Sequence, residues 1–112
     1  MVVPRDSQLN QLFRALADGT RRDILARSLV QEESVSELAS HYRMSFAAVQ
    51  KHVAVLERAG LITKRASGRE QRVCANPARL RRASESLAHF EKIWRQRSAQ
   101  LDQLLAEDTK GK

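Results

Sequence analysis

The chain has 112 residues, a length that fits one domain, and 42% of them are apolar, enough for a modest core. Twenty lysines and arginines against thirteen acidic residues give a net charge of +7, so an acidic partner is expected: nucleic acid, an anionic membrane surface or an acidic protein. The single cysteine, Cys74, excludes an internal disulfide. The sequence shows no run of about 18 apolar residues and no signal peptide, so we expect a cytoplasmic protein without a membrane span.

Three helices are predicted before residue 43. The first covers residues 7–17, where apolar side chains recur at i, i+3, i+4 and i+7: Leu9, Leu12, Phe13 and Leu16. Ser7 is its expected N-cap, and Asp18 or Thr20 is expected to cap a second helix that ends near residue 30. After a short polar segment at residues 32–34, a third helix is expected over residues 35–42.

A fourth helix is predicted over residues 46–58. Ser45 has the character of an N-cap, and Val49, Val53 and Leu56 give the helix one apolar face. Gly60 suits the left-handed position that commonly follows the last helical turn. The sequence therefore places a well-delimited amphipathic helix directly after a short turn.

Two strands and a long helix complete the chain. Strand candidates at residues 61–65 and 71–75 flank a glycine-containing turn, which predicts a β-hairpin. Asn76 and Pro77 end the second strand and begin a helix expected to reach residue 107, followed by a disordered tail at residues 108–112. Apolar residues along that helix alternate steps of three and four, and the pattern resumes after Arg97: Leu80, Ala83, Leu87, Phe90, Trp94, Leu101, Leu104 and Leu105. One small domain cannot cover so long an apolar face, which indicates packing against a second copy.

Positive charge is concentrated in the middle of the chain. Ten basic residues lie between Arg43 and Arg82 and only two acidic ones, so this stretch alone carries a net charge of +8. A surface that only keeps a protein in solution usually mixes the two signs more evenly. The predicted fourth helix and the hairpin both fall within this stretch.

Two short helices joined by a tight turn, with a basic hairpin after the second, form the layout of a winged helix-turn-helix. The major groove of B-DNA is about 12 Å wide and admits an α-helix. Ala47 and Ala48 are small enough for close approach, while Gln50 suits adenine and Lys51 suits guanine or phosphate. The pattern therefore predicts that the fourth helix reads base edges while the hairpin lies along the backbone or in the minor groove.

The stretch from Ser45 to Ile62 resembles the recognition-helix signature of the ArsR-type bacterial repressors. The family pattern Ser-x-x-x-Val-x-x-His-Leu-x-x-Leu-x-x-x-Gly-Leu-Val is matched except that Val53 replaces Leu and Ile62 replaces Val. Residues 15–25 and 35–39 are also similar to that family, and the likeness extends over roughly residues 9–75. The implied fold is mainly α with a small β-hairpin, in the order α-α-α-α-β-β-α, as one domain over residues 1–107.

The resemblance implies a sequence-specific repressor that binds an inverted-repeat operator in double-stranded DNA as a homodimer. Residues 34–75 would form the helix-turn-helix and wing, and the helices at 7–17 and 77–107 would form the dimer. The residues expected at the DNA are Ser45, Phe46, Ala47, Gln50, Lys51, His52, Arg69 and Arg72. Those expected at the dimer interface are Leu9, Leu12, Phe13, Leu87, Phe90, Trp94 and Leu101.

Several of these residues have other readings. Phe46 replaces a residue that is often polar in the family, and it could contact a thymine methyl group instead of reading a polar base edge. For His52, a structural role or a phosphate contact is favoured over base reading, and Arg69 and Arg72 are expected at phosphates. Contact with the flanking backbone or a solvated surface fits Arg21, Arg22 and Arg43 equally well: the sequence does not decide.

We predict neither a metal nor a cofactor, and no small-molecule effector is evident. One family metal site uses paired cysteines in the third helix, where residues 35–41 hold none; another uses four ligands on the last helix, which offers only His89 and a nearby Glu85. No nucleophile–base motif, phosphate loop or carboxylate pair indicates an enzyme. The alternatives are a thiol-redox response at Cys74 and a protein-interaction module that pairs through the last helix.

Overall fold

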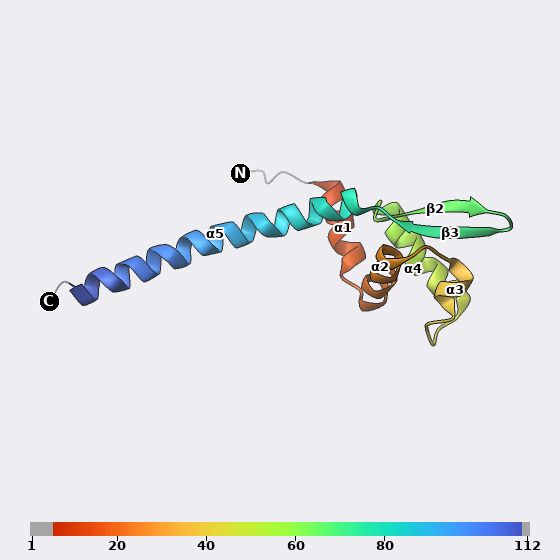
Figure 1. The fold of residues 1–112 in the computed structure, drawn as a ribbon, viewed down its shortest axis with the longest axis horizontal. Coiled ribbons are helices and arrows are strands. Elements are labelled where there is room, and N and C mark those ends of the chain that lie inside the picture. The colour runs from red at the N-terminus through yellow and green to blue at the C-terminus, as the bar shows by residue number, and fades with distance from the viewer. Residues whose placement is uncertain (1–5, 111–112) are drawn as a thin grey trace.

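A computed structural model describes residues 6–110 of the chain. In chain order the elements are α1 (Ser7–Leu16), α2 (Gly19–Val30), β1 (Glu33–Ser34), α3 (Val35–Ala39), α4 (Phe46–Arg58), β2 (Ile62–Ser67), β3 (Glu70–Ala75) and α5 (Pro77–Lys110). Figure 1 shows α1 to α4 gathered into a globular body, from which the hairpin extends on one side and α5 on the other. The predicted class, mainly α with a small β-hairpin, is confirmed.

Short polar side chains set the starts of the helices. Asp18 and Ser45 cap α2 and α4 as predicted, each accepting a hydrogen bond from a backbone N–H of the first turn. For α1 the cap is Asp6, whose carboxylate accepts from the amide of Leu9 at 2.9 Å. Ser7, the expected cap, is already inside the helix. The backbone of Asp6, one residue earlier, has the extended conformation that a cap requires.

The sheet has three antiparallel strands in the order β1-β3-β2. The hairpin of β2 and β3 pairs Ile62 with Ala75 at its base and Ser67 with Glu70 at its tip, where Gly68 has a positive φ of 61°. The third strand, β1, pairs with β3 at the short polar segment 32–34, where the predicted order of elements has no strand. That prediction was wrong because two polar residues carry no alternation, and only the position of β3 makes them a strand.

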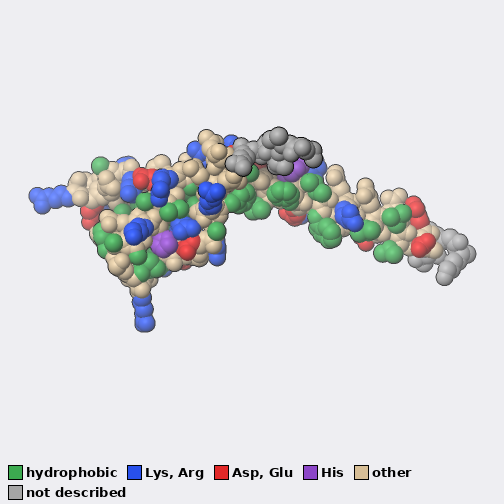
Figure 2. Space-filling view, turned by 180° about the vertical axis from the view of Figure 1, so that it is seen from behind, with side chains coloured by type: hydrophobic (Ala, Val, Ile, Leu, Met, Phe, Trp, Pro, Cys, Tyr) green, Lys and Arg blue, Asp and Glu red, His purple; other side chains and the backbone are tan. Residues whose placement is uncertain are grey.

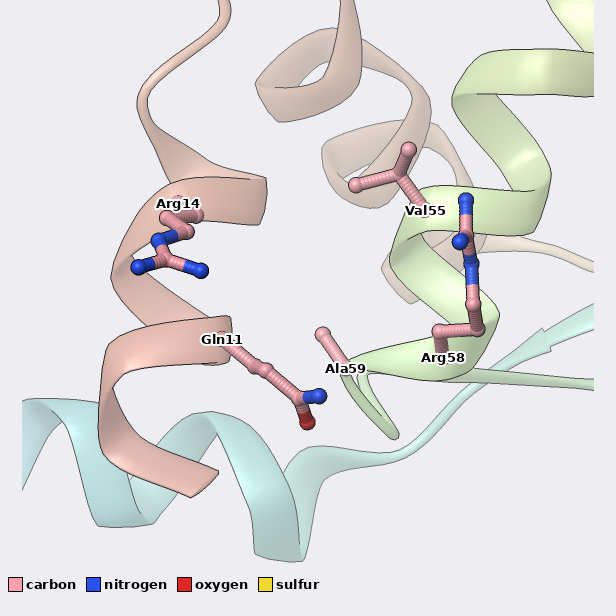
Figure 3. A pocket seen from close by; sticks show the side chains of 5 residues that line it. All are labelled: Gln11, Arg14, Val55, Arg58 and Ala59. Atoms are coloured by element: carbon pink, nitrogen blue, oxygen red, sulfur yellow. The ribbon is translucent and has the colours of Figure 1, made fainter. Parts of the chain in front are cut away.

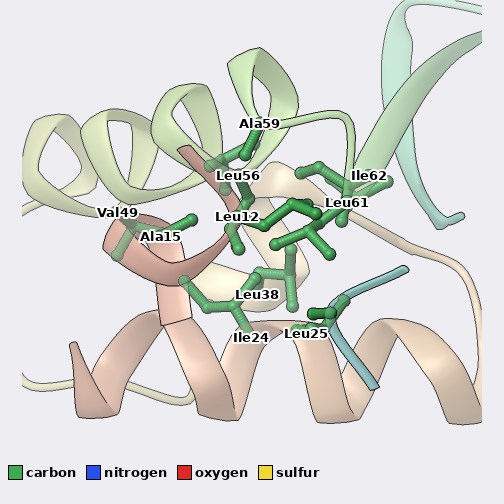
Figure 4. Packing of buried hydrophobic residues seen from close by; sticks show 13 residues of the cluster. Leu12, Ala15, Ile24, Leu25, Leu38, Val49, Leu56, Ala59, Leu61 and Ile62 are labelled. Atoms are coloured by element: carbon green, nitrogen blue, oxygen red, sulfur yellow. The ribbon is translucent and has the colours of Figure 1, made fainter. Parts of the chain in front are cut away.

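The core lies where α1, α2, α3 and α4 meet the inner face of the sheet (Figure 4). Its largest fully buried side chains are Leu12, Ile24, Leu38, Leu56, Leu61, Ile62, Val49, Val53 and Val73. Leu12 was expected at the dimer interface. That expectation is wrong, because the side chain is fully buried within the single chain and leaves no surface for a partner. Leu9 and Phe13 are half-buried and pack against this core from its edge.

The start of α5 is fastened to the globular body. Arg79 Nη1 donates to Gln8 Oε1 at 3.2 Å, and Arg82 forms an ion pair with Asp6, so α5 is held to α1. Asn76, expected to cap α5, donates its side-chain amide to the carbonyl of Gly60 at 3.0 Å. Ala83 is the last apolar side chain of α5 that is buried in the core.

Beyond Ala83 the helix projects from the body, and the described chain spans 76 × 34 × 23 Å. It continues to Lys110, so the predicted disorder is wrong for residues 108–110; residues 111–112 lie outside the described part. The helix continues because no glycine or proline interrupts it before Gly111. No helix within residues 6–110 has the length and apolar character needed to cross a membrane.

Candidate nucleic-acid interface

The two helices of the helix-turn-helix are α3 and α4, joined by a turn over residues 40–45. On α4, Val49, Val53 and Leu56 are fully buried, which orients the helix by its apolar face. Most of the residues predicted to contact DNA are exposed: Ser45, Phe46, Ala47, Gln50 and Lys51. These residues occupy the cap and the N-terminal half of α4, the end that a recognition helix presents to base edges.

The wing brings a positive charge next to this face. Arg69 follows Gly68 at the tip of the hairpin, is exposed, and has no ion pair among the described residues. A groove of about 220 Å³ joins it to the recognition helix. Its walls come from β1, α3, α4, the hairpin turn and β3: Ser34, Val35, Ser36, Phe46, Gln50, Arg69, Glu70 and Gln71. The structure therefore brings Phe46, Gln50 and Arg69 to one surface, although they are up to 23 positions apart in the chain.

Arg72 does not lie at the wing tip. It stands opposite Ser34 of β1 in the sheet, and its Nη1 donates to the carbonyl oxygen of Glu32 at 3.3 Å. Its Nη2 is 3.9 Å from a carboxylate oxygen of Glu37. These contacts hold the guanidinium between β1 and α3, so a phosphate would have to compete for it with protein groups.

His52 faces the junction of α1 and α2 and away from the exposed side of α4. Its Nδ1 lies 3.4 Å from Nη1 of Arg21 and 3.8 Å from the Asp18 carboxylate, and only 23% of its side chain is exposed. These contacts favour the structural role among the readings considered for His52. They also join the recognition helix to the residue that caps α2.

Arg21 and Arg22 act on the end of α1. Arg21 donates to the carbonyl oxygens of Ala15 at 2.8 Å and Arg14 at 2.9 Å, and Arg22 donates to that of Leu16 at 2.8 Å. The last carbonyls of a helix lack partners within the helix, so cationic side chains stabilise them. The structure therefore favours a structural role for these two arginines over contact with DNA.

For Arg43 the sequence also left open whether it contacts the DNA backbone or is only solvated. It lies in the turn two residues before Ser45, is exposed, and forms no ion pair with any described residue. This position places an unpaired positive charge beside the exposed end of α4. The signal available in the sequence was its location immediately before the cap of the recognition helix.

Cys74 lies on β3 and is half-buried beside Glu32. Burial raises the pKa of its thiol above the ordinary value of 9.0, and the neighbouring Glu32 carboxylate raises it further. A protonated thiol is a poor nucleophile, so this environment disfavours rapid oxidation. Among residues 6–110, no three His, Cys, Asp or Glu side chains come together in a way that could hold a metal ion.

Comparison with known proteins gives a consistent result. A family model described as "Bacterial regulatory protein, arsR family" matches residues 18–64. A crystal structure of an ArsR family transcriptional regulator shares 32% identity over 84% of this chain and 97% of that chain, with a TM-score of 0.75. An ArsR-like transcriptional regulator from Rhodococcus sp. RHA1 shares 33% identity over 88% and 92%, with a TM-score of 0.74. No curated protein sequence matches.

A more distant structure supports the fold alone. It is the homodimeric winged helix-turn-helix DNA-binding domain of Mb0332 from Mycobacterium bovis, with 21% identity over 82% of this chain and 92% of that chain and a TM-score of 0.63. The chain belongs to the ArsR family of winged helix-turn-helix, DNA-binding transcriptional regulators.

Proposed function

We propose that the protein is a repressor that binds an inverted-repeat operator in double-stranded DNA as a homodimer. One observation carries the proposal: the exposed half of α4 and the wing arginine Arg69 line the same groove. A helix in the major groove needs small residues for close approach and polar ones for readout, and Ala47, Gln50 and Lys51 supply both. As a partner of DNA, the protein would act in the cytoplasm.

The contacts of this surface divide into two kinds. Gln50 and Lys51 would meet base edges, with the exposed ring of Phe46 against a thymine methyl group. Arg69 and Arg43 would meet phosphates on either side, which strengthens binding to all sequences and makes it depend on salt. Specificity therefore rests on few side chains, and the spacing of two half-sites has to supply the rest.

The projecting part of α5 supports the proposal that the protein forms a homodimer. Leu87, Phe90, Trp94 and Leu101 are spaced along one face of the helix, and each remains between 44% and 62% exposed in the single chain. Figure 2 shows hydrophobic side chains gathered along one side of α5 beyond the body. The relative from Mycobacterium bovis is described as homodimeric. A two-fold dimer places two recognition helices on two half-sites of opposite direction, hence the inverted repeat.

The decisive experiment selects binding sites from a random DNA pool with the full chain and with the variant Q50A/K51A. The full chain is expected to enrich an inverted repeat, and the variant to lose about 1–3 kcal/mol of discrimination at the bases that these side chains read. The variant R69A serves as the matched control, because it should weaken binding to all sequences alike and lower the salt dependence. An unchanged site preference in Q50A/K51A would overturn the assignment of α4.

Repression and the alternative of a protein-interaction module need separate measurements. A promoter carrying the selected repeat is expected to lose transcription when the full chain is added, and to keep it with Q50A/K51A. A chain that forms no homodimer and binds no duplex near physiological salt would instead support the interaction module.

A further inference from the structure

A groove between α1 and α4 lies apart from the surface assigned to DNA. It has a volume of about 190 Å³ and is lined by Gln11 and Arg14 of α1 and by Val55, Arg58 and Ala59 at the C-terminal end of α4. Figure 3 shows Gln11 reaching from α1 toward Ala59, with Arg14 and Arg58 on opposite sides of the space. Gln50 and Lys51, expected at base edges, precede the α4 residues of the groove by four to nine positions, which is roughly 6–14 Å along the helix at 1.5 Å per residue.

The two arginines of the groove have no acidic partner among residues 6–110. Arg14 contributes only its backbone carbonyl to the contacts described above, and its guanidinium forms no ion pair. Arg58 makes one long contact, from Nε to the carbonyl oxygen of Ala54 at 3.5 Å, which leaves its two terminal nitrogens available. By contrast, Arg27 and Arg82 form ion pairs with Asp23 and Asp6, and Arg21 donates to backbone carbonyl oxygens.

The residues that line the groove indicate the charge and size of a ligand that would fit it. Two guanidinium groups on facing walls favour an anion, and a carboxylate matches their planar geometry. Val55 and Ala59 add an apolar wall, and Gln11 adds an amide that can donate or accept one hydrogen bond. The volume is below the roughly 300–1,000 Å³ typical of sites for drug-sized molecules, so the ligand must be small.

We propose that the α1–α4 groove binds a small organic monocarboxylate with an aromatic or short aliphatic body. The carboxylate lies between Arg14 and Arg58, and the body lies against Val55 and Ala59. The inference concerns binding of a ligand and goes beyond the proposed DNA-binding function. It stands or falls independently of the operator, because no residue of the groove belongs to the surface assigned to DNA.

The test is a titration of the full chain with benzoate, followed by two-dimensional NMR of backbone amides and methyl groups. We expect saturable shifts at Val55 and Ala59. Benzamide has the same ring without the charge, and acetate has the charge without the ring, so both are expected to bind at least about tenfold more weakly.

The variant R14Q/R58Q is expected to weaken benzoate binding by at least about tenfold while its circular dichroism spectrum stays unchanged. R81Q is the matched control, because Arg81 is an exposed arginine of α5 outside the groove, and its benzoate affinity should equal that of the parent. Absent shifts at Val55 and Ala59, or equal binding of benzamide and benzoate, would overturn the proposal. NMR shifts at Val55 and Ala59 that depend only on protein concentration would also overturn it, because a second copy of the chain would then occupy the groove.

Discussion

The globular body and the projecting part of α5 place their apolar side chains in opposite environments. In the body, residues such as Leu38, Val49 and Leu56 are fully buried by their own chain. In α5 beyond Ala83, Phe90 and Trp94 are each 62% exposed although they follow an equally regular spacing. The same kind of pattern therefore produces a completed core in one region and an exposed apolar stripe in the other.

The difference has a physical cause. A helix surrounded by other elements within one chain buries its apolar face when the chain folds, as α4 does between α1, α2 and α3. A helix that projects beyond the body has no such neighbours, and only a second molecule can remove its apolar face from water. Stability of the body should therefore be a property of the single chain, whereas any gain from α5 should depend on concentration.

The largest expected effect comes from truncating a side chain of the body core. Leu38→Ala removes a fully buried side chain and leaves a cavity, so the free energy of unfolding should fall by about 2–5 kcal/mol. Urea denaturation followed by circular dichroism measures the loss. Leu87→Ala makes the same chemical change on α5 and should stay within about 0.5 kcal/mol at concentrations where the chain is monomeric. Equal losses in both variants would contradict the division between the two regions.

The next effect concerns association through α5. The variant F90E/W94E places two charges on the exposed stripe, and burying them in a dimer is unfavourable. The dissociation constant of the dimer should rise by at least about 30-fold, which corresponds to about 2 kcal/mol. Sedimentation equilibrium measures it. Lys92→Glu reverses a charge on the opposite face of the same helix and should leave the constant unchanged; if it disrupts the dimer as strongly, the stripe is not the interface.

A smaller effect tests the start of the recognition helix. The Ser45 hydroxyl accepts the amide of Ala48 at 3.1 Å, so Ser45→Ala should lower the free energy of unfolding by about 1 kcal/mol. Thermal denaturation of the unbound protein measures this loss apart from any effect on DNA. Ser45→Asp keeps an acceptor at the cap and should restore most of the stability. Equal stability of all three proteins would show that the cap contributes nothing.

The smallest effect is a pH dependence within the body. The Tyr42 hydroxyl donates to Asp23 at 2.5 Å, and this hydrogen bond, with a further one from Arg27, lowers the pKa of the Asp23 carboxyl below its ordinary value of 3.8. The unfolded chain therefore takes up this proton first as the pH falls, so stability present above 3.8 is lost below it. Melting temperatures measured across this range should fall less steeply for Asp23→Asn than for the parent. Identical slopes would refute the contribution of Asp23.

Much of the architecture could be predicted because its signals are local. The apolar spacing of α4, the cap at Ser45 and the glycine after its last turn lie within 16 consecutive residues, and the structure reproduces all three. Gly60 has a φ of 78°, the left-handed conformation that its position after the helix suggested. The hairpin was recognisable for the same reason, since its turn and both strands are adjacent in the chain.

Several features that the sequence did not indicate depend on residues distant in the chain. The strand β1 forms because β3 lies beside it, and its two polar residues give no sequence signal of that pairing. His52 fits the family motif, yet Asp18 and Arg21 determine where its ring lies. Arg72 is one of two basic candidates near the wing, and its place in the sheet beside Ser34 separates it from Arg69.

The sequence by itself determined the helices, the hairpin, the recognition-helix motif and the family resemblance, because periodicity, caps and turns act over a few residues. The tertiary structure alone decided which apolar residues are buried within the chain and which remain exposed. Leu12 and Phe90 belong to equally regular patterns, but one is enclosed by the body and the other projects past it. Burial depends on what surrounds a residue in space, and that is settled only when distant segments pack.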